Sequence, residues 1–245
     1  MDVAVVTGAA QGIGQAIATR LLQRGGTVWC VDNDVDRLAT TVRQLSSGPG
    51  FPIAHSCDVG DADAVAGLWR DIDTAGDMVT ALVNNAGIFP RSTALATSVD
   101  EWNRVLAVNL TGGFLMARHL ARRLIERDQR GSVVSVTSGQ AYQPHDRAPA
   151  YAATKAALAN LSRSLAYEWG PFGIRVNTVV PGLTDTAQSR ATKRDEDYVA
   201  AAATVPMRRI GTPEDVAAAV AFLLSTDAAH ITGHALAVNG GRLML

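Results

Sequence analysis

The sequence predicts an α/β fold in which one doubly wound sheet of about seven parallel strands is covered by helices on both faces. The first observation is that short runs rich in β-branched residues alternate with longer segments of helical period along all 245 residues. The second is that each run except the last is followed by a helical segment, which is the pattern of parallel strands joined by helices. The predicted strands are Val3–Val6, Thr27–Val31, Ile53–Ser56, Ala81–Val83, Ser132–Val136, Ile174–Val179 and Ala235–Val238.

The segments between these strands have the signals of helices and loops. The first predicted helix, Gly12–Gly25, has apolar side chains spaced by four residues. A polar helix after the second strand continues to about Leu45, and the sequence SSGPG at 46–50 marks a loop. The longest helical segment runs from about Ser98 to Arg127.

One domain covering residues 1–245 is the economical interpretation, because no Pro/Gly-rich linker, internal repeat or low-complexity tract divides the chain. One irregular segment, 183–207, follows the sixth strand, and an insertion of this size is either a surface excursion or a lid over an active site. Its charged residues, which precede a short alanine-rich helix, are Arg190, Lys193, Arg194, Asp195, Glu196 and Asp197. We predict a substrate lid at about 183–207, whose basic side chains either favour a substrate carboxylate or form a solvated surface.

Composition and charge exclude several classes of protein. With 22 basic and 23 acidic residues and no basic stripe, the chain is not expected to bind nucleic acid. We find neither a signal peptide nor an apolar run long enough to span a membrane, so we expect a soluble cytoplasmic protein. Cys30 and Cys57 lie in strand-like stretches and are interpreted as small buried hydrophobic residues. No cysteine or histidine pattern has metal-ligand spacing, so no metal is predicted.

Residues suited to proton transfer occur between Ser138 and Lys155. Tyr151 and Lys155 are four residues apart, so they share one face if the segment is helical. A phenol titrates near pH ~10, and a lysine ammonium one turn away favours the phenolate and brings its pKa toward the working range. Ser138, at the end of the fifth strand, can hold a carbonyl or alcohol oxygen beside the tyrosine. This set suits proton transfer at a C–O bond while a hydride moves at carbon. The alternative is a chance YxxxK pattern in an ordinary helix.

A glycine-rich loop follows the first strand and opens the first helix. Gly8, Gly12 and Gly14 can bring a pyrophosphate close to the helix N-terminus, where free N–H groups favour an anion. Asp32 ends the second strand, where a carboxylate can accept hydrogen bonds from both hydroxyls of an adenosine ribose. The alternative is that Asp32 merely begins a turn. The context predicts a dinucleotide site, and Asp32 predicts NAD rather than its 2′-phosphorylated form.

The charge expected around Asp32 supports that choice of cofactor. The nearest basic residue downstream, Arg37, is expected to lie a turn along the next helix beside the acidic Asp34 and Asp36. Gln11, in the glycine loop, adds no positive charge. No cation is therefore expected to receive a 2′-phosphate.

Read together with Asn84-Asn85-Ala86-Gly87 and Asn109, these motifs resemble those of the short-chain dehydrogenase/reductase family, of the type often called classical, over essentially the whole chain. The resemblance implies a single Rossmann-type domain that binds a dinucleotide and catalyses the reaction. The cofactor-binding residues that it implies are Gly8, Gln11, Gly12, Ile13, Gly14, Asp32, Asp58, Val59, Asn85, Ala86, Gly87, Tyr151, Lys155, Pro181, Gly182, Thr184 and Thr186.

Two departures from the family are visible. Asn239 stands where the family often has Asp before a terminal pair of glycines, and we expect only a local change in hydrogen bonding. Gln11 stands where many members that prefer the phosphorylated cofactor carry a basic residue.

The resemblance also implies four catalytic residues. Tyr151 would be the general acid/base, and Ser138 would hydrogen-bond the reacting oxygen. Lys155 would lower the tyrosine pKa and bind the nicotinamide ribose, and Asn109 would hold a water that links Lys155 to solvent. An asparagine inside a helical segment can instead satisfy backbone groups. His145, in the loop before Tyr151, is either solvated or part of the pocket wall.

We therefore predict an NAD-dependent oxidoreductase that interconverts a small secondary alcohol and its ketone. One alternative is a 3-oxoacyl-thioester (acyl-carrier-protein) reductase of fatty-acid synthesis, which usually uses the phosphorylated cofactor and is therefore disfavoured by Asp32. Another is a catalytically silent dinucleotide-binding protein, which would be expected to lose Ser138, Tyr151 or Lys155. By analogy with the family, the helices around 109–124 and 151–169 imply a homo-oligomer, either a dimer or a tetramer.

Overall fold

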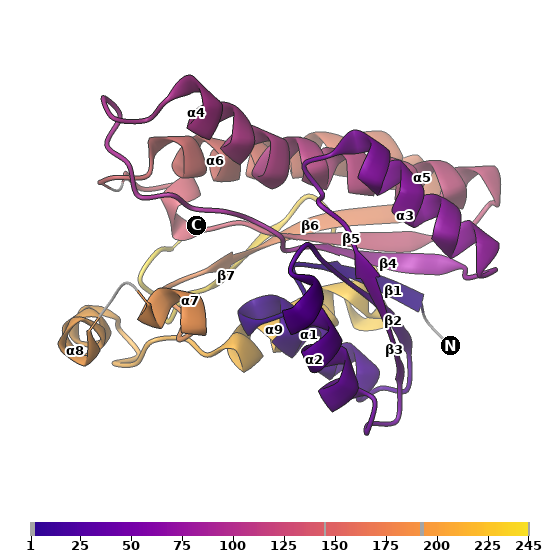
Figure 1. The fold of residues 1–245 in the computed structure, drawn as a ribbon, viewed down its shortest axis with the longest axis horizontal. Coiled ribbons are helices and arrows are strands. Elements are labelled where there is room, and N and C mark those ends of the chain that lie inside the picture. Colours follow the sequence, from indigo (N-terminus) through magenta and orange to yellow (C-terminus); the bar gives the residue numbers. More distant parts are fainter. Residues whose placement is uncertain (1–2, 145, 192–193, 245) are drawn as a thin grey trace.

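Seven parallel strands form one sheet in the computed structural model, which describes residues 3–144, 146–191 and 194–244 (Figure 1). The spatial order is β3-β2-β1-β4-β5-β6-β7, so the chain winds outward from the centre twice, in opposite directions. The strand order therefore reverses between β1 and β4. The strands are β1 (Val3–Thr7), β2 (Thr27–Asp32), β3 (Phe51–Ser56), β4 (Val79–Asn84), β5 (Gly131–Val136), β6 (Ile174–Pro181) and β7 (Ala235–Val238). All seven predicted strands are present.

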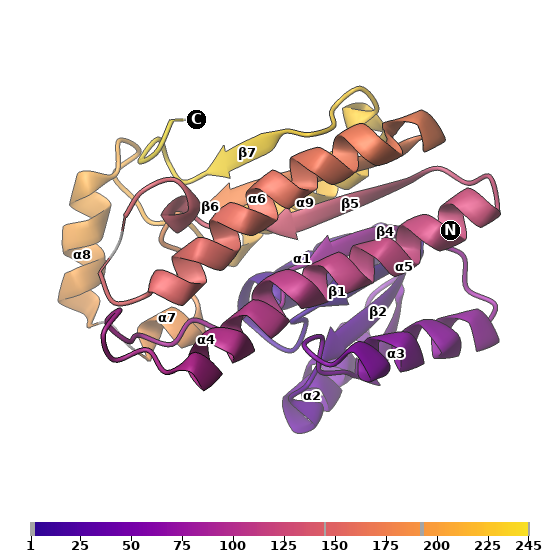
Figure 2. The ribbon, with the colours of Figure 1, turned by 90° about the horizontal axis from the view of Figure 1, so that it is seen from above.

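Helices cover both faces of the sheet, which confirms the predicted doubly wound α/β fold (Figures 1 and 2). One layer contains α3 (Ala62–Thr74), α4 (Val99–Leu106), α5 (Gly113–Glu126) and α6 (Pro149–Trp169), and the other contains α1 (Gly12–Leu22), α2 (Val35–Leu45) and α9 (Pro213–Leu224). Two further helices, α7 (Ala187–Arg190) and α8 (Asp195–Thr204), follow β6 at one end of the sheet. Within the described ranges, we find no helix with the length and apolar character that a membrane span requires.

The central strands are apolar along their length because they contribute to two hydrophobic cores. Val3 and Val5 pack into the core beneath α3 and α5, whereas Ala4 and Val6 pack into the core beneath α1 and α9. Successive side chains of a strand point to opposite faces, so a strand buried on both sides has no polar position.

The predicted helix from Ser98 to Arg127 is interrupted in the structure. Between α4 and α5, residues 107–112 form a π turn, which contains Asn109. At Gly112 the backbone passes so close to the β3–α3 connection that a Cβ atom would lie 2.5 Å from Val59 O. The long helix therefore changes its winding where it meets the end of the sheet, a tertiary contact that helical periodicity does not encode.

Arg175 on β6 secures the C-terminus of α9, and its replacement should destabilise the fold. Its guanidinium donates hydrogen bonds to Leu223 O (2.6 Å), Leu224 O (3.2 Å), Ser225 O (3.1 Å) and Ile231 O (3.4 Å), most of which are carbonyls that a helix end leaves unpaired. Arg175→Met keeps the aliphatic stem but removes every donor, so we expect a loss of about 2–4 kcal/mol in the free energy of unfolding.

Urea titration followed by circular dichroism measures this loss. Arg70→Met, on the exposed surface of α3, is the matched control and should change stability by less than about 0.5 kcal/mol. Equal stability of the Arg175 and Arg70 variants would contradict the capping role.

Candidate active site

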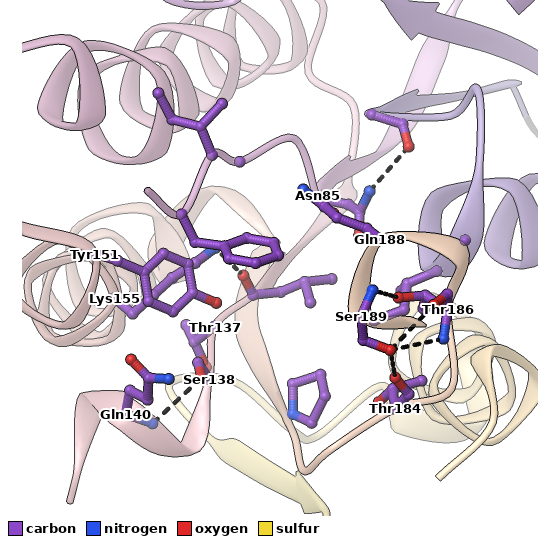
Figure 3. A pocket seen from close by; sticks show the side chains of 18 of the residues that line it. Asn85, Thr137, Ser138, Gln140, Tyr151, Lys155, Thr184, Thr186, Gln188 and Ser189 are labelled. Atoms are coloured by element: carbon purple, nitrogen blue, oxygen red, sulfur yellow. Dashed lines mark hydrogen bonds between the residues drawn. The ribbon is translucent and has the colours of Figure 1, made fainter. Parts of the chain in front are cut away.

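A cavity of about 900 Å³ lies at the carboxyl ends of the strands, where the strand order reverses (Figure 3). Open α/β sheets bind ligands in such crevices. Every predicted cofactor-binding residue except Gly14 lines this cavity, and so does every predicted catalytic residue except Asn109. Residues from the glycine loop to the β6–α7 connection therefore converge on one space.

The glycine loop is held against the end of β4 by Asn85. Its side-chain amide donates hydrogen bonds to Thr7 O (3.0 Å) and Gly8 O (3.1 Å). Gly14 lies behind the loop rather than in the cavity, where a Cβ atom would lie 2.0 Å from Gly8 O. No side chain caps the N-terminus of α1 beside this loop. Its N–H groups are thus available to an anion, which suits a pyrophosphate.

Asp32 is positioned by two backbone groups at the end of β2. One carboxylate oxygen accepts a hydrogen bond from Ala10 N and the other from Asp34 N, both at 3.0 Å. The carboxylate is thus fixed beside the glycine loop at the wall of the cavity. Its position fits the recognition of a ribose hydroxyl pair.

Arg37 lies closer to the glycine loop than the sequence analysis expects. Its guanidinium donates a hydrogen bond to the Gln11 side-chain oxygen and pairs with Asp34 at 3.4 Å. The pairing with an acidic neighbour agrees with the prediction, whereas the contact with the loop does not. Arg37 lies in the first turn of α2, which is close to the loop, so it contacts Gln11 although the two residues are far apart in sequence.

Asp58 and Val59 line the cavity after β3. The Asp58 carboxylate pairs with Arg104 of α4 at 2.7 Å and accepts a hydrogen bond from Gly60 N at 2.9 Å. Partial burial works to raise the pKa of Asp58, but these two donors hold it below its ordinary value. Arg104 thereby ties α4 to the connection after β3.

Ser138, Tyr151 and Lys155 lie together in another part of the cavity, away from Asp32. Ser138 follows β5, and its hydroxyl is hydrogen-bonded to the phenol of Tyr151 on α6. Lys155, one turn further along α6, donates a hydrogen bond to Val136 O (2.8 Å) and lies 5.6 Å from the centre of the Tyr151 ring. The sequence spacing therefore does place the lysine and the tyrosine on one helix face.

The two ionisable groups of this cluster are shifted mainly by burial. Burial lowers the pKa of Lys155 to about 8, so its ammonium remains mostly protonated at neutral pH. Burial raises the pKa of Tyr151, and the hydrogen bond with Ser138 offsets this only in part. From the sequence, a lowered tyrosine pKa is expected. The difference arises because burial of the phenol, which the sequence spacing does not show, raises the pKa of Tyr151.

Asn109 lies just outside the cavity and braces its wall. Its side chain accepts a hydrogen bond from Ile88 N (2.8 Å) and donates to Ile88 O (2.8 Å) and to Thr154 Oγ1 (3.3 Å). These bonds satisfy the backbone of the segment after β4, which is the alternative that the sequence analysis leaves open. Its proposed water between Lys155 and solvent stays a prediction.

The β6–α7 connection closes another side of the cavity. Thr184 donates a hydrogen bond to Gly182 O (3.2 Å), and Thr186 caps α7 through Ser189 N (3.1 Å). In the following segment, Arg190 pairs with Asp185 and Asp195. Arg194 lies 3.8 Å from Glu196.

The charges of this segment are therefore largely balanced, which weakens the expectation of a substrate carboxylate there. Lys193 and His145, the other residues that the sequence analysis considers here, lie outside the described residues. Whether 183–207 acts as a lid also stays a prediction.

Several residues of the cavity wall are missing from the sequence-based set. Phe89, just after β4, packs edge-on against the Tyr151 ring with 5.9 Å between centroids. Gln140, Gln188 and Leu243 also line the cavity, and they come from the turn after β5, from α7 and from the segment after β7. None belongs to a motif, so only the fold brings them to the site. The described residues contain no cluster of three or more histidine, cysteine, aspartate or glutamate side chains suited to a metal.

Comparisons with known proteins agree with this geometry. Residues 8–242 match the family model described as "Enoyl-(Acyl carrier protein) reductase". D-threitol dehydrogenase from Mycolicibacterium smegmatis is 34% identical over 239 residues, which cover 98% of this chain and 92% of that protein.

Two solved structures are also closely similar. The 3-oxoacyl-[acyl-carrier protein] reductase from Brucella melitensis has a TM-score of 0.93 at 35% identity, covering 100% of this chain and 92% of its own. An NAD(P)-dependent gluconate 5-dehydrogenase, as it is described, from Beutenbergia cavernae with NADP bound at low occupancy has a TM-score of 0.91 at 35% identity, covering 98% of this chain and 96% of its own. On its sequence, its fold and these matches, the chain belongs to the short-chain dehydrogenase/reductase family, of the classical type.

Proposed function

We propose that this protein interconverts a small secondary alcohol and its ketone with NAD as cofactor and Tyr151 as general acid/base. That the protein is an oxidoreductase for CH–OH groups, with a nicotinamide dinucleotide as cofactor, follows from its family. The single observation that supports NAD as cofactor and Tyr151 as acid/base is that one cavity is lined by Ser138, Tyr151 and Lys155 and also by Asp32.

Each residue of the catalytic cluster has a separate role in the proposed reaction. Ser138 holds the alcohol oxygen, and Tyr151 exchanges its proton with that oxygen. Removal of the hydroxyl proton leaves an alkoxide, whose carbon is the better hydride donor. Lys155 supplies positive charge beside the phenol. A bound nicotinamide ring would supply the hydride chemistry.

The dinucleotide would extend from this cluster to the glycine loop. The free N–H groups at the start of α1 suit its pyrophosphate, and Asp58 and Val59 line the part of the cavity that its adenine would use. Pro181, Gly182, Thr184 and Thr186 would hold the nicotinamide carboxamide. Asn85, Ala86 and Gly87 would pass beside the cofactor.

The preference for NAD rests on Asp32. A 2′-phosphate at the ribose would face this carboxylate, and two unit charges at 4 Å repel by ~1 kcal/mol in water and ~4 kcal/mol at an effective dielectric constant of 20. Each ~1.4 kcal/mol changes an affinity tenfold, so we expect discrimination between several-fold and about a thousandfold. Arg37 is the group that would favour the 2′-phosphorylated cofactor. Its contacts with Asp34 and Gln11 make its positive charge less available to a phosphate.

Replacing Asp32 by alanine should therefore shift the cofactor preference toward the 2′-phosphorylated form. The measurement is kcat/KM for both cofactors with one good substrate. Asp36→Ala on α2 is the matched control, because Asp36 is exposed and does not line the cavity. Its cofactor ratio should stay within about twofold of the wild type, since an exposed charge interacts weakly across water. A wild-type ratio near one, or the same ratio in Asp32→Ala, would show that Asp32 does not recognise the ribose.

A second candidate function is reduction of a 3-oxoacyl thioester. It is favoured by the match over the whole chain to the reductase from Brucella melitensis. Reduction of acetoacetyl thioesters with the phosphorylated cofactor, faster than any small ketone with NADH, would support this candidate over the first. A catalytically silent binding protein would show cofactor binding without turnover of either class.

We also propose that the chain forms a homo-oligomer, a dimer or a tetramer, through the helices α5 and α6. Large apolar side chains lie exposed on or beside these helices, among them Tyr167 (91% exposed) on α6 and Trp102 (39%) on α4. A contact between subunits would remove such groups from water. Light scattering in solution measures the assembly.

A further inference from the structure

Gln140 has a buried side-chain oxygen without a hydrogen-bond partner beside the catalytic cluster. The oxygen is shielded from solvent, and no group among the described residues donates to it. The residue lines the cavity, and Figure 3 shows its side chain next to Ser138 on the same side as Tyr151. Buried amide oxygens in folded proteins are nearly always paired, so an unpaired one beside a ligand cavity points to a ligand that donates a hydrogen bond.

The backbone of Gln140 is tied to the catalytic serine. Gln140 N donates a hydrogen bond to Ser138 Oγ at 3.2 Å, and both residues belong to the short turn after β5. The position of the Gln140 side chain is thus fixed relative to the group that would hold the reacting oxygen. Its terminal carboxamide torsion is soft, so the oxygen can turn into the cavity at little cost.

We propose that Gln140 determines substrate specificity by accepting a hydrogen bond from a hydroxyl on the carbon next to the reacting one. The substrate class is therefore a vicinal diol or the corresponding hydroxyketone, rather than a simple alcohol. This inference rests on the proposed function, because that function places the reacting oxygen at Ser138 and Tyr151.

Two further residues of the cavity wall suit a neutral polyhydroxy substrate, although Arg91 and Arg242 also line the cavity. Gln188 and Thr204 line the cavity from α7 and α8, and both carry uncharged hydrogen-bonding groups. The nearby guanidinium of Arg190 is paired with Asp185 and Asp195 and does not favour an anion. An unpaired acceptor recognises a donor, whereas a second ketone oxygen next to the reacting carbon would leave Gln140 unsatisfied.

The test compares 2,3-butanediol with 2-butanol, which differ by one hydroxyl. We expect wild-type kcat/KM to favour the diol by about 10- to 100-fold, and Gln140→Met, which keeps the length but removes the acceptor, to reduce this ratio by at least about tenfold. Gln140→Glu keeps the length and an acceptor oxygen, so it should retain the diol preference. Gln129→Met, an exposed glutamine that does not line the cavity, is the matched control and should leave the ratio within about twofold of the wild type.

A binding measurement separates this inference from the proposed function. Tyr151→Phe is expected to turn over little, and calorimetry of this variant with NAD present can compare the two alcohols at equilibrium. Tighter binding of the diol, lost on adding Gln140→Met, supports the inference even if the Tyr151 assignment fails. Equal binding of the two alcohols, or no binding of either, overturns it. The same holds if Gln140→Glu loses the preference, or if Gln129→Met has as large an effect as Gln140→Met.

Discussion

Replacing Tyr151 by phenylalanine should lower kcat by roughly 100- to 10,000-fold, the range for loss of a general acid/base. The substitution keeps the ring, which packs against Phe89, and removes only the hydroxyl that Ser138 contacts. The Kd for NAD should therefore remain close to that of the wild type. Steady-state kinetics with a substrate alcohol and a calorimetric titration with NAD measure the two quantities.

Tyr142→Phe is the matched control for this experiment. Tyr142 lies in the turn after β5, and its buried hydroxyl has no hydrogen-bond partner among the described residues. Removal of that hydroxyl takes away no interaction and should leave kcat within about twofold of the wild type. Near-wild-type turnover in Tyr151→Phe would overturn the acid/base assignment, whatever the result for Tyr142.

Lys155→Met should reduce kcat by at least about a hundredfold and also weaken NAD binding, because the lysine is assigned two roles. The Lys155 ammonium lies 5.6 Å from the centre of the Tyr151 ring, and at an effective dielectric constant of 20 a unit charge at that distance favours the phenolate by about 3 kcal/mol. Removal of the ammonium should therefore raise the pKa of Tyr151 further. The acid limb of the pH profile for alcohol oxidation should move to higher pH.

The profile of kcat/KM against pH checks this shift, and Lys155→Arg is the comparison that retains a positive charge. The Arg variant should keep the acid limb nearer its wild-type position, even if the longer side chain lowers the rate. A Met variant with an unchanged profile would show that Lys155 acts on the structure of α6 and not on the proton transfer.

Much of the fold follows from local signals in the sequence. The strands were predictable because a buried parallel strand leaves a short run without polar positions, as Val3 to Val6 shows. The pairing of Tyr151 with Lys155 was predictable because a spacing of four residues is one helical turn. Asp32 was predictable because the end of β2 always lies at the same edge of the sheet as the glycine loop.

Other parts of the site depend on contacts that local signals do not contain. The contact of Arg37 with Gln11 joins α2 to the glycine loop, and Phe89 contacts Tyr151 from the segment that Asn109 braces. The pKa of Tyr151 depends on how completely the cavity wall encloses its phenol, which spacing alone cannot give. The Arg190 guanidinium does not stand as a free positive charge, because it pairs with two aspartates.

The π turn at residues 107–112 also fixes the rotational phase of the two helices that it joins. Each residue of an α-helix turns the chain by about 100°, so removing one residue from the turn would rotate every side chain of α4 by that angle relative to α5. Arg104 would then leave Asp58, and the apolar Val105 would leave the core. The π turn therefore lets α4 and α5 present differently oriented faces, one toward Asp58 and one toward the sheet. The number of residues in this one turn therefore determines which way the side chains of α4 point relative to α5.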